Sequence, residues 1–305
     1  MINKKFCITM SGFVIASLML TGCSSMFGNP MKYVISQDET RQEQTESQND
    51  TGNNDTSSDE QISPEEDNDN QGIYILGTDK MSDYSVSGML KTVKEINENI
   101  DDDKTKGIIL IGEEQYIDYI SYFISLTVED KKPLVIIKNL NDDTEQAALI
   151  SQVKSYINGE AESLPQDCIV NKNVSDVFDI SSVKALPDVD IFYDYIGANT
   201  DELSKKIYIS NGMVIIPSTS GADISSETYE IISQKNIASV VITCSKDILD
   251  TKIKDNSADN IYYTDLEPYK ARLMLMFLLN KNSDSDSIKN CLLYTSPSPR
   301  DLSTS

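Results

Sequence analysis

The sequence predicts an α/β protein of two domains, each built on a mainly parallel sheet with helices on both faces. Two observations predict this class. Short apolar runs, which are typical of buried strands, alternate with stretches in which apolar residues recur at helical spacing. A Ser-rich stretch with a proline divides them, so we expect domains at 73–178 and 190–290 joined by a linker at 179–189. The runs expected to form strands are IYIL, GIILI, PLVII, DIFYDY, MVII and SVVIT.

The helices expected between the strands follow from apolar side chains that recur on one helical face. The last helix is expected from Pro268, which suits a first helical turn, to Asn280. Three earlier helices are predicted from Val86, Leu90, Val93 and Ile96, from Ile117, Ile120, Ile124 and Val128, and from Ala147, Ile150, Val153 and Ile157.

The first 22 residues are typical of a signal peptide, with Lys4 and Lys5 before an apolar run that is too short to span a bilayer. The run ends in Leu-Thr-Gly-Cys, which resembles the bacterial lipobox. This resemblance implies that Cys23 is lipidated and becomes the mature N-terminus. We therefore expect an extracytoplasmic protein whose partner is the membrane, held through lipid on Cys23.

The mature chain is expected to begin with a segment at 23–36 that includes an apolar run, MKYVI, as a first strand. Residues 37–72 are rich in acids and nearly free of apolar side chains, so we expect them to be disordered. Two interpretations stay open for this acidic segment. It is either a stalk above the membrane or a replacement for a mobile active-site loop.

Composition excludes several classes of function. The formal net charge is −23, which argues against nucleic acid as a partner. The chain has no histidine, so Ser-His and Cys-His nucleophile pairs and histidine-containing zinc sites are excluded. Cys168 and Cys244 lie in apolar runs and are expected as buried thiols. We expect neither a metal nor a cofactor.

The C-terminal segment at 291–305 begins CLLYTSPSPRD. It resembles one reading frame of an adaptor used in sequencing libraries, so we expect it to be non-native.

Four collinear segments resemble the bacterial L-asparaginase/glutaminase family. GIILIGEEQYIDYISYFISLTVEDKKPLVII is similar to the family's strand, His-Gly-Thr-Asp-Thr turn, helix and next strand. IYILGTDKMSD is similar to its substrate-holding segment, LPDVDIFYDYIGANTDEL to the start of its C-terminal domain, and EPYKARLMLMFLL to its closing helix. The resemblance implies an asparaginase-like two-domain fold, a small amino-acid ligand and a homo-oligomer.

The resemblance also shows which catalytic groups have changed. The family uses a nucleophilic threonine together with a Thr-Asp-Lys trio, because a hydroxyl needs an activating neighbour. The Thr-Asp pair falls on Glu114 and Gln115, and the substrate-holding pair falls on Thr78 and Asp79. If MKYVI is the first strand, Thr40 stands where the nucleophile would be. The lysine-bearing segment is largely missing, and Lys172 is not assigned its role.

Three functions therefore compete. The main hypothesis is an asparaginase-like protein that has lost catalysis and retains a binding or scaffold role. An active amidohydrolase that uses Thr40 or Thr78 is the second, and a solute-binding lipoprotein is the third. Glu113 and Glu114 are interpreted as acids that cap a helix, with an acid–base or cation site as the alternative.

Overall fold

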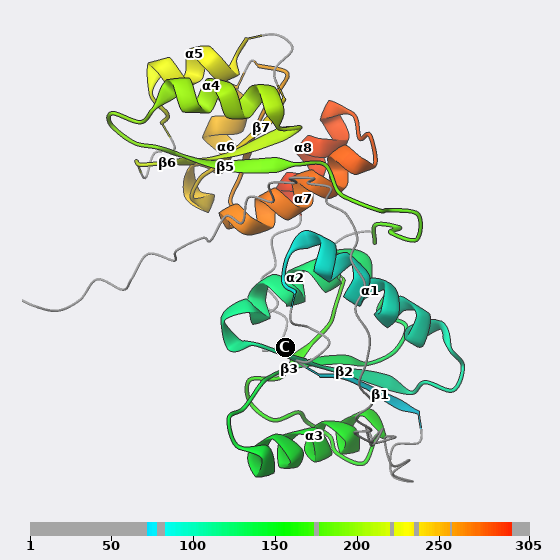
Figure 1. Cartoon of the computed structure of the whole chain (residues 1–305). Helices are drawn as coiled ribbons and strands as arrows, with labels where there is room; N and C mark the ends of the chain where they lie inside the picture. Colours follow the sequence, from blue (N-terminus) through cyan, green and yellow to red (C-terminus); the bar gives the residue numbers. More distant parts are fainter. Residues whose placement is uncertain are drawn as a thin grey trace, which may run out of the picture. The chain divides into compact units, whose positions relative to one another are not determined.

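The computed structural model describes residues 72–77, 83–173, 177–219, 223–234, 238–256 and 258–294. These residues form two four-stranded sheets, one after the other along the chain (Figure 1). The predicted α/β class with mainly parallel sheets is confirmed.

The N-terminal sheet has the strand order β1-β2-β3-β4. Its first three strands are parallel, and β4 runs antiparallel to β3. The register places Gly112 of β2 beside Lys138 of β3, so both strands end at the same edge. The elements are β1 (Ile73–Leu76), α1 (Val86–Asp101), β2 (Gly107–Gly112), η2 (Glu114–Tyr116), α2 (Ile117–Thr127), β3 (Leu134–Lys138), α3 (Asp143–Ile157) and β4 (Ile169–Val170).

Helices cover both faces of this sheet. Successive residues of a strand point to opposite faces, so each strand contributes side chains to two cores. In β2, Ile108 and Leu110 join the core under α1 and α2. Ile109 and Ile111 join the core under α3. Figure 1 shows α1 and α2 on one side of the strands and α3 on the other.

The C-terminal sheet is entirely parallel, in the order β5-β6-β7-β8. Its faces are also both covered: Val214 packs with α7 and α8, whereas Met213 and Ile215 pack with α4 and α5. The elements are β5 (Val189–Asp194), α4 (Thr200–Ile209), β6 (Gly212–Pro217), α5 (Ser226–Ile232), β7 (Ser239–Thr243), α6 (Lys246–Asp255), β8 (Ile261–Thr264), α7 (Pro268–Asn280) and α8 (Ser285–Tyr294).

One hydrophobic core includes side chains from both sheets and joins them through α2 and α7. The ring of Phe123 meets the ring of Phe277 edge-on, with 5.4 Å between centroids. Phe178 stacks on the other side of Phe277 at 5.1 Å. Lys270 of α7 lies over the ring of Tyr122, 5.8 Å from its centroid. The N-terminal and C-terminal lobes thus share buried surface.

The six predicted strands and a helix at Pro268–Asn280 are confirmed, but this helix is not the last one, because α8 follows it. Two strands were not predicted. β4 has only two residues, and β8 reads IYYT, in which two tyrosines replace the aliphatic run expected of a buried strand.

The predicted linker at 179–189 has Ile180 and Val183 buried against the shared core. Within the predicted tail, residues 291–294 complete α8, and Leu292 is buried. Its carbonyl accepts a hydrogen bond from Oγ1 of Thr264 at 2.8 Å. The non-native origin of 291–305 stays a prediction.

The predicted N-terminal segments, at 1–22, 23–36 and 37–72, lie outside the described residues except for Gly72. Among the helices that the structure describes, none is long and apolar enough to cross a membrane.

Candidate functional site

The candidate site lies at the carboxyl ends of β1, β2 and β3, where ligands bind in open α/β sheets. After each of these strands comes a polar or aromatic residue that contacts a residue after a neighbouring strand. Tyr84 follows β1, Glu113 follows β2 and Asn139 follows β3. Because the three strands are parallel, these residues meet at one edge of the sheet.

Glu113 is the centre of this group. Its backbone N–H donates to the phenolic oxygen of Tyr84 at 3.2 Å. Its carboxylate oxygen Oε1 accepts from Nδ2 of Asn139 at 3.4 Å, and the N–H of Asn139 donates to the carbonyl of Gly112 at 2.9 Å. Three loops that are distant in sequence are therefore joined through one residue.

Two tyrosine rings form a stacked pair beside Glu113. Tyr84 and Tyr116 have ring centroids 4.2 Å apart, and Tyr116 is 38% exposed. Burial raises the pKa of Tyr84, an effect that its bond from Glu113 partly opposes. The phenol therefore stays neutral at physiological pH. This pair offers a flat aromatic surface next to a carboxylate.

Glu114 and Gln115, where the resemblance places a catalytic Thr-Asp pair, are exposed on the single turn of η2. Glu113 occupies the N-cap position of that turn but makes no capping bond through its side chain. The predicted position of Glu113 and Glu114 at the start of a helical turn agrees with the structure, but the carboxylate of Glu113 bonds Asn139 and does not cap the turn. Thr40, Thr78, Asp79 and Cys23 lie outside the described residues.

Lys172 lies at the opposite end of the sheet from Glu114. The backbone N–H of Asn171 donates to the carbonyl of Leu134, the first residue of β3, at 2.8 Å. Glu113 follows the other end, beside Lys138 in register. Four residues of strand separate these ends by about 13 Å.

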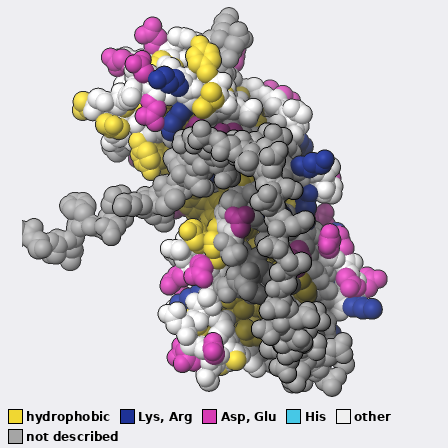
Figure 2. Space-filling view, in the orientation of Figure 1, with side chains coloured by type: hydrophobic (Ala, Val, Ile, Leu, Met, Phe, Trp, Pro, Cys, Tyr) yellow, Lys and Arg dark blue, Asp and Glu magenta, His cyan; other side chains and the backbone are white. Residues whose placement is uncertain are grey.

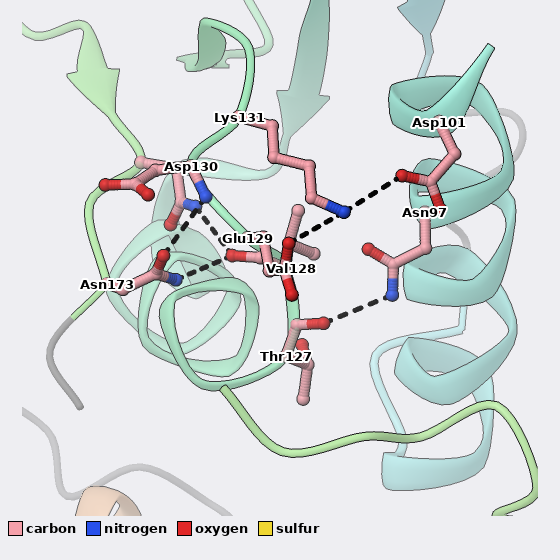
Figure 3. Close-up of polar contacts among 9 residues, drawn as sticks. Asn97, Asp101, Thr127, Val128, Glu129, Asp130, Lys131 and Asn173 are labelled. Atoms are coloured by element: carbon pink, nitrogen blue, oxygen red, sulfur yellow. Dashed lines mark hydrogen bonds and ion pairs between the residues drawn. The ribbon is translucent and has the colours of Figure 1, made fainter. Parts of the chain in front are cut away.

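The segment around Lys172 is fixed there by polar contacts with the loop between α2 and β3 (Figure 3). Nδ2 of Asn173 donates to the carbonyl of Val128 at 2.6 Å, and its Oδ1 accepts from the N–H of Asp130 at 3.0 Å. On the other side of this loop, Asn97 donates to the carbonyl of Thr127 at 3.1 Å. Lys172 itself is exposed.

Lys138 was not predicted as a site residue, although it ends β3 at the edge where the site lies. Its ammonium group lies 3.7 Å from a carboxylate oxygen of Asp167. Among the residues that the structure describes, no group of three or more acids and cysteines could hold a metal ion.

Tyr84, Tyr116 and Asn139 were also missed by sequence reasoning. The available signal was the position of Tyr84 and Asn139 in the loops that follow two predicted strands. Side chains after neighbouring parallel strands share an edge, so the strand assignment alone could have identified Asn139 and Tyr84 as candidates. The stacking of Tyr116 depends on the one-turn helix, which the sequence did not reveal.

Comparisons with known proteins agree with the resemblance. L-asparaginase 2 of Bacillus subtilis (strain 168) is 24% identical over 261 residues, which cover 66% of this chain and 68% of that protein. Glutaminase-asparaginase of Pseudomonas fluorescens biotype A is 29% identical over 120 residues, which cover 37% of this chain and 33% of that protein. No family model matches the sequence.

A solved structure shares the fold. The crystal structure of a probable cytoplasmic L-asparaginase from Campylobacter jejuni superposes with a TM-score of 0.54 at 18% identity. The match covers 72% of this chain and 98% of that one. The sequence matches and the shared fold together make this chain a distant homologue of the L-asparaginase/glutaminase family.

Proposed function

We propose that this chain is a non-catalytic asparaginase-like protein that binds a small amino-acid ligand outside the cytoplasm. The observation that carries the proposal is the pair Glu114 and Gln115, which is exposed on one turn where the resemblance requires Thr-Asp. A carboxylate and an amide do not supply the activated hydroxyl that this chemistry needs.

The position of Lys172 supports the same proposal. A general base must come within hydrogen-bond reach of the proton that it removes. Lys172 is held by its neighbours at the start of β3, about 13 Å of strand away from the turn that carries Glu114. It therefore cannot complete a catalytic trio with residues at that turn.

Binding would use the groups that remain at the strand ends. The Tyr84–Tyr116 pair offers an apolar surface, and the carboxylate of Glu113 suits the ammonium group of an amino acid. The lipid on Cys23 would hold the protein on the outer side of the cytoplasmic membrane. Replacing Cys23 with Ser should release the protein from the membrane fraction.

The first test is ammonia release from asparagine and glutamine by the purified chain, beside an active homologue. We expect no release, together with an increase in melting temperature when the bound amino acid is present. Tyr116→Ala should abolish that increase, because it removes half of the aromatic surface, whereas Tyr156→Ala on α3 should not. Ammonia release at ordinary enzymatic rates would contradict the proposal.

An active amidohydrolase is the second candidate, since the matched relatives are named as an asparaginase and a glutaminase-asparaginase. It would use Thr40 or Thr78 as nucleophile. Thr40→Ala and Thr78→Ala separate the candidates, because ammonia release that one change abolishes identifies the nucleophile. A solute-binding lipoprotein is the third candidate, and it would show ligand-induced stabilisation without turnover in the presence of its transported solute.

A further inference from the structure

Arg272 of α7 is a partly buried cation without an acidic partner among the described residues, of which it is the only arginine. Lys270 on the same helix has the usual arrangement, since its ammonium group lies 3.0 Å from a carboxylate oxygen of Glu267. In the part of the chain that the structure describes, no carboxylate forms an ion pair with Arg272. Charges that are partly withdrawn from water are generally paired, so this guanidinium is suited to an anion from elsewhere.

The fold uses one of the five N–H groups of this guanidinium. Nε donates to the carbonyl of Val189, the first residue of β5, at 2.5 Å. This bond is structural, and it fixes the orientation of the side chain. The four N–H groups on Nη1 and Nη2 make no hydrogen bond with the described residues. Their planar fork matches the two oxygens of a carboxylate.

Two tyrosines lie beside Arg272. Tyr269 is three residues earlier on α7, so the two side chains share one helical face. The ring of Tyr119, on α2, packs against the ring of Tyr269 with 6.5 Å between centroids. Tyr119 therefore lies at the face of α7 that carries Arg272. Its phenol makes no hydrogen bond with any residue that the structure describes, so it is a second donor available at this place.

The electrostatics at the Tyr119 phenol suit an anion, although the chain as a whole is acidic. The formal net charge is −23, and Figure 2 shows acidic side chains spread over the surface of both lobes. Burial raises the pKa of Tyr119 to about 12, while Arg272 lowers it and Asp83 has a smaller, opposite effect. The phenol therefore stays protonated and can donate, and the charge of Arg272 outweighs that of Asp83 at its oxygen.

We infer that Arg272 and Tyr119 form a binding site for the carboxylate group of a small organic acid. Nη1 and Nη2 would hold the two oxygens, and the phenol would donate to one of them. The rings of Tyr119 and Tyr269 offer apolar surface to a short hydrocarbon chain. A carboxylate suits the site better than a phosphate dianion, because one guanidinium balances one negative charge and the excess would lie near Asp83.

The inference does not rest on the proposed function, since a simple carboxylic acid has no ammonium group for Glu113 to hold. The same chemistry has a second source in the acid-rich segment at 37–72 of this chain. The experiment therefore separates a free acid from the acids of that segment.

Butyrate is the probe, because it has one carboxylate and a short apolar chain. At about five times its dissociation constant, and at constant ionic strength against chloride, it should raise the melting temperature of the full chain by about 2–4 °C. Butyramide has nearly the same shape without the charge and should cause no increase. Inorganic phosphate should cause a smaller increase than butyrate.

Three variants test the two donors. Arg272→Gln should abolish the increase, whatever it does to the melting temperature without butyrate. Arg272→Lys keeps the charge but loses the fork, and Tyr119→Phe keeps the ring but loses the donor. Each of these two should raise the dissociation constant for butyrate about three- to tenfold. Lys289→Gln on α8 is the matched control, because it removes one positive charge at an exposed position, and it should respond like wild type.

A response to butyrate that Arg272→Gln and Tyr119→Phe leave intact would overturn the inference. The second arm is a full-length variant in which the acids at 37–72 are replaced by their amides. No response in either this variant or wild type would also overturn the inference. A response in the amide variant alone, abolished by adding Arg272→Gln, would keep the carboxylate site and assign its occupant to the chain's own acidic segment.

Discussion

The backbone N–H of Glu113 donates to the phenolic oxygen of Tyr84 at 3.2 Å and so joins the loops that follow β1 and β2. The same tyrosine stacks on Tyr116, one turn after Glu113. Tyr84 thus fixes both the backbone and the aromatic surface of the candidate site.

Replacing Tyr84 with Phe tests this hydrogen bond. The ring remains to stack on Tyr116, but the N–H of Glu113 loses its acceptor. We expect the free energy of unfolding to fall by about 0.5–1.5 kcal/mol in urea denaturation, with an unchanged m-value. Tyr208→Phe is the control, because that side chain is 82% exposed. Equal stability of the two variants would show that the bond contributes nothing.

Replacing Asn173 with Ala tests the anchor that holds Lys172 away from the site. Asn173 donates to the carbonyls of Val128 and Ser125 and accepts from the N–H of Asp130. We expect a loss of about 1–3 kcal/mol in the free energy of unfolding, because buried carbonyls lose their donors. Hydrogen exchange should also become faster at Asp130.

Asn141→Ala is the matched control for that change, since Asn141 is exposed in the loop before α3. It should alter the stability by less than about 0.5 kcal/mol. If Asn173→Ala behaves like the control, the loop between α2 and β3 is held by its apolar neighbours alone.

The sequence predicts the fold better than it predicts the site. Runs such as GIILI and SVVIT are long and aliphatic enough to be assigned as buried strands without tertiary information. β8 was missed because Tyr262 and Tyr263 bury their rings through packing against helices, which no local pattern reveals.

The site depends on distances between loops that are far apart in sequence. Glu114 and Gln115 lie at the turn that the sequence predicts after β2, but the resemblance gave no reason to select Asn139. The contact between Asn139 and Glu113 follows only from the register of β2 and β3. The position of Lys172 likewise needed the short antiparallel β4, whose two residues carry almost no sequence signal.

The shared core predicts that the two lobes unfold together. Phe277 is 1% exposed and contacts Phe123 and Phe178. Phe277→Ala should lower the free energy of unfolding by about 3–5 kcal/mol, because it leaves a cavity between α2 and α7. Hydrogen exchange measured on β2 and β6 should accelerate in both strands.

The control for this change is Tyr229→Ala, which removes a ring that is 41% exposed on α5. Its effect should be smaller and should leave β2 unaffected. Loss of protection in β6 alone after Phe277→Ala would mean that the lobes are separate cooperative units.

The pKa of Tyr119 predicts how stability changes in alkali. Burial raises this pKa from 10.0 to about 12, with a smaller increase from Asp83 and an opposing effect of Arg272. Because the folded state favours the neutral phenol, the stabilisation is fully present below about pH 10 and is lost as the pH rises toward about 12. Within that window the free energy of unfolding should fall by at most about 1.4 kcal/mol per pH unit through this group.

Tyr119→Phe separates this effect from the titration of the other tyrosines, since it keeps the ring and removes the ionisable oxygen. The difference in stability between wild type and Tyr119→Phe should be constant below about pH 10 and should shift in favour of the variant above it. Urea denaturation at a series of pH values measures the difference. A difference that stays constant up to about pH 12 would mean that Tyr119 titrates alike in the folded and unfolded chains, and that α2 and α7 do not exclude water from its phenol.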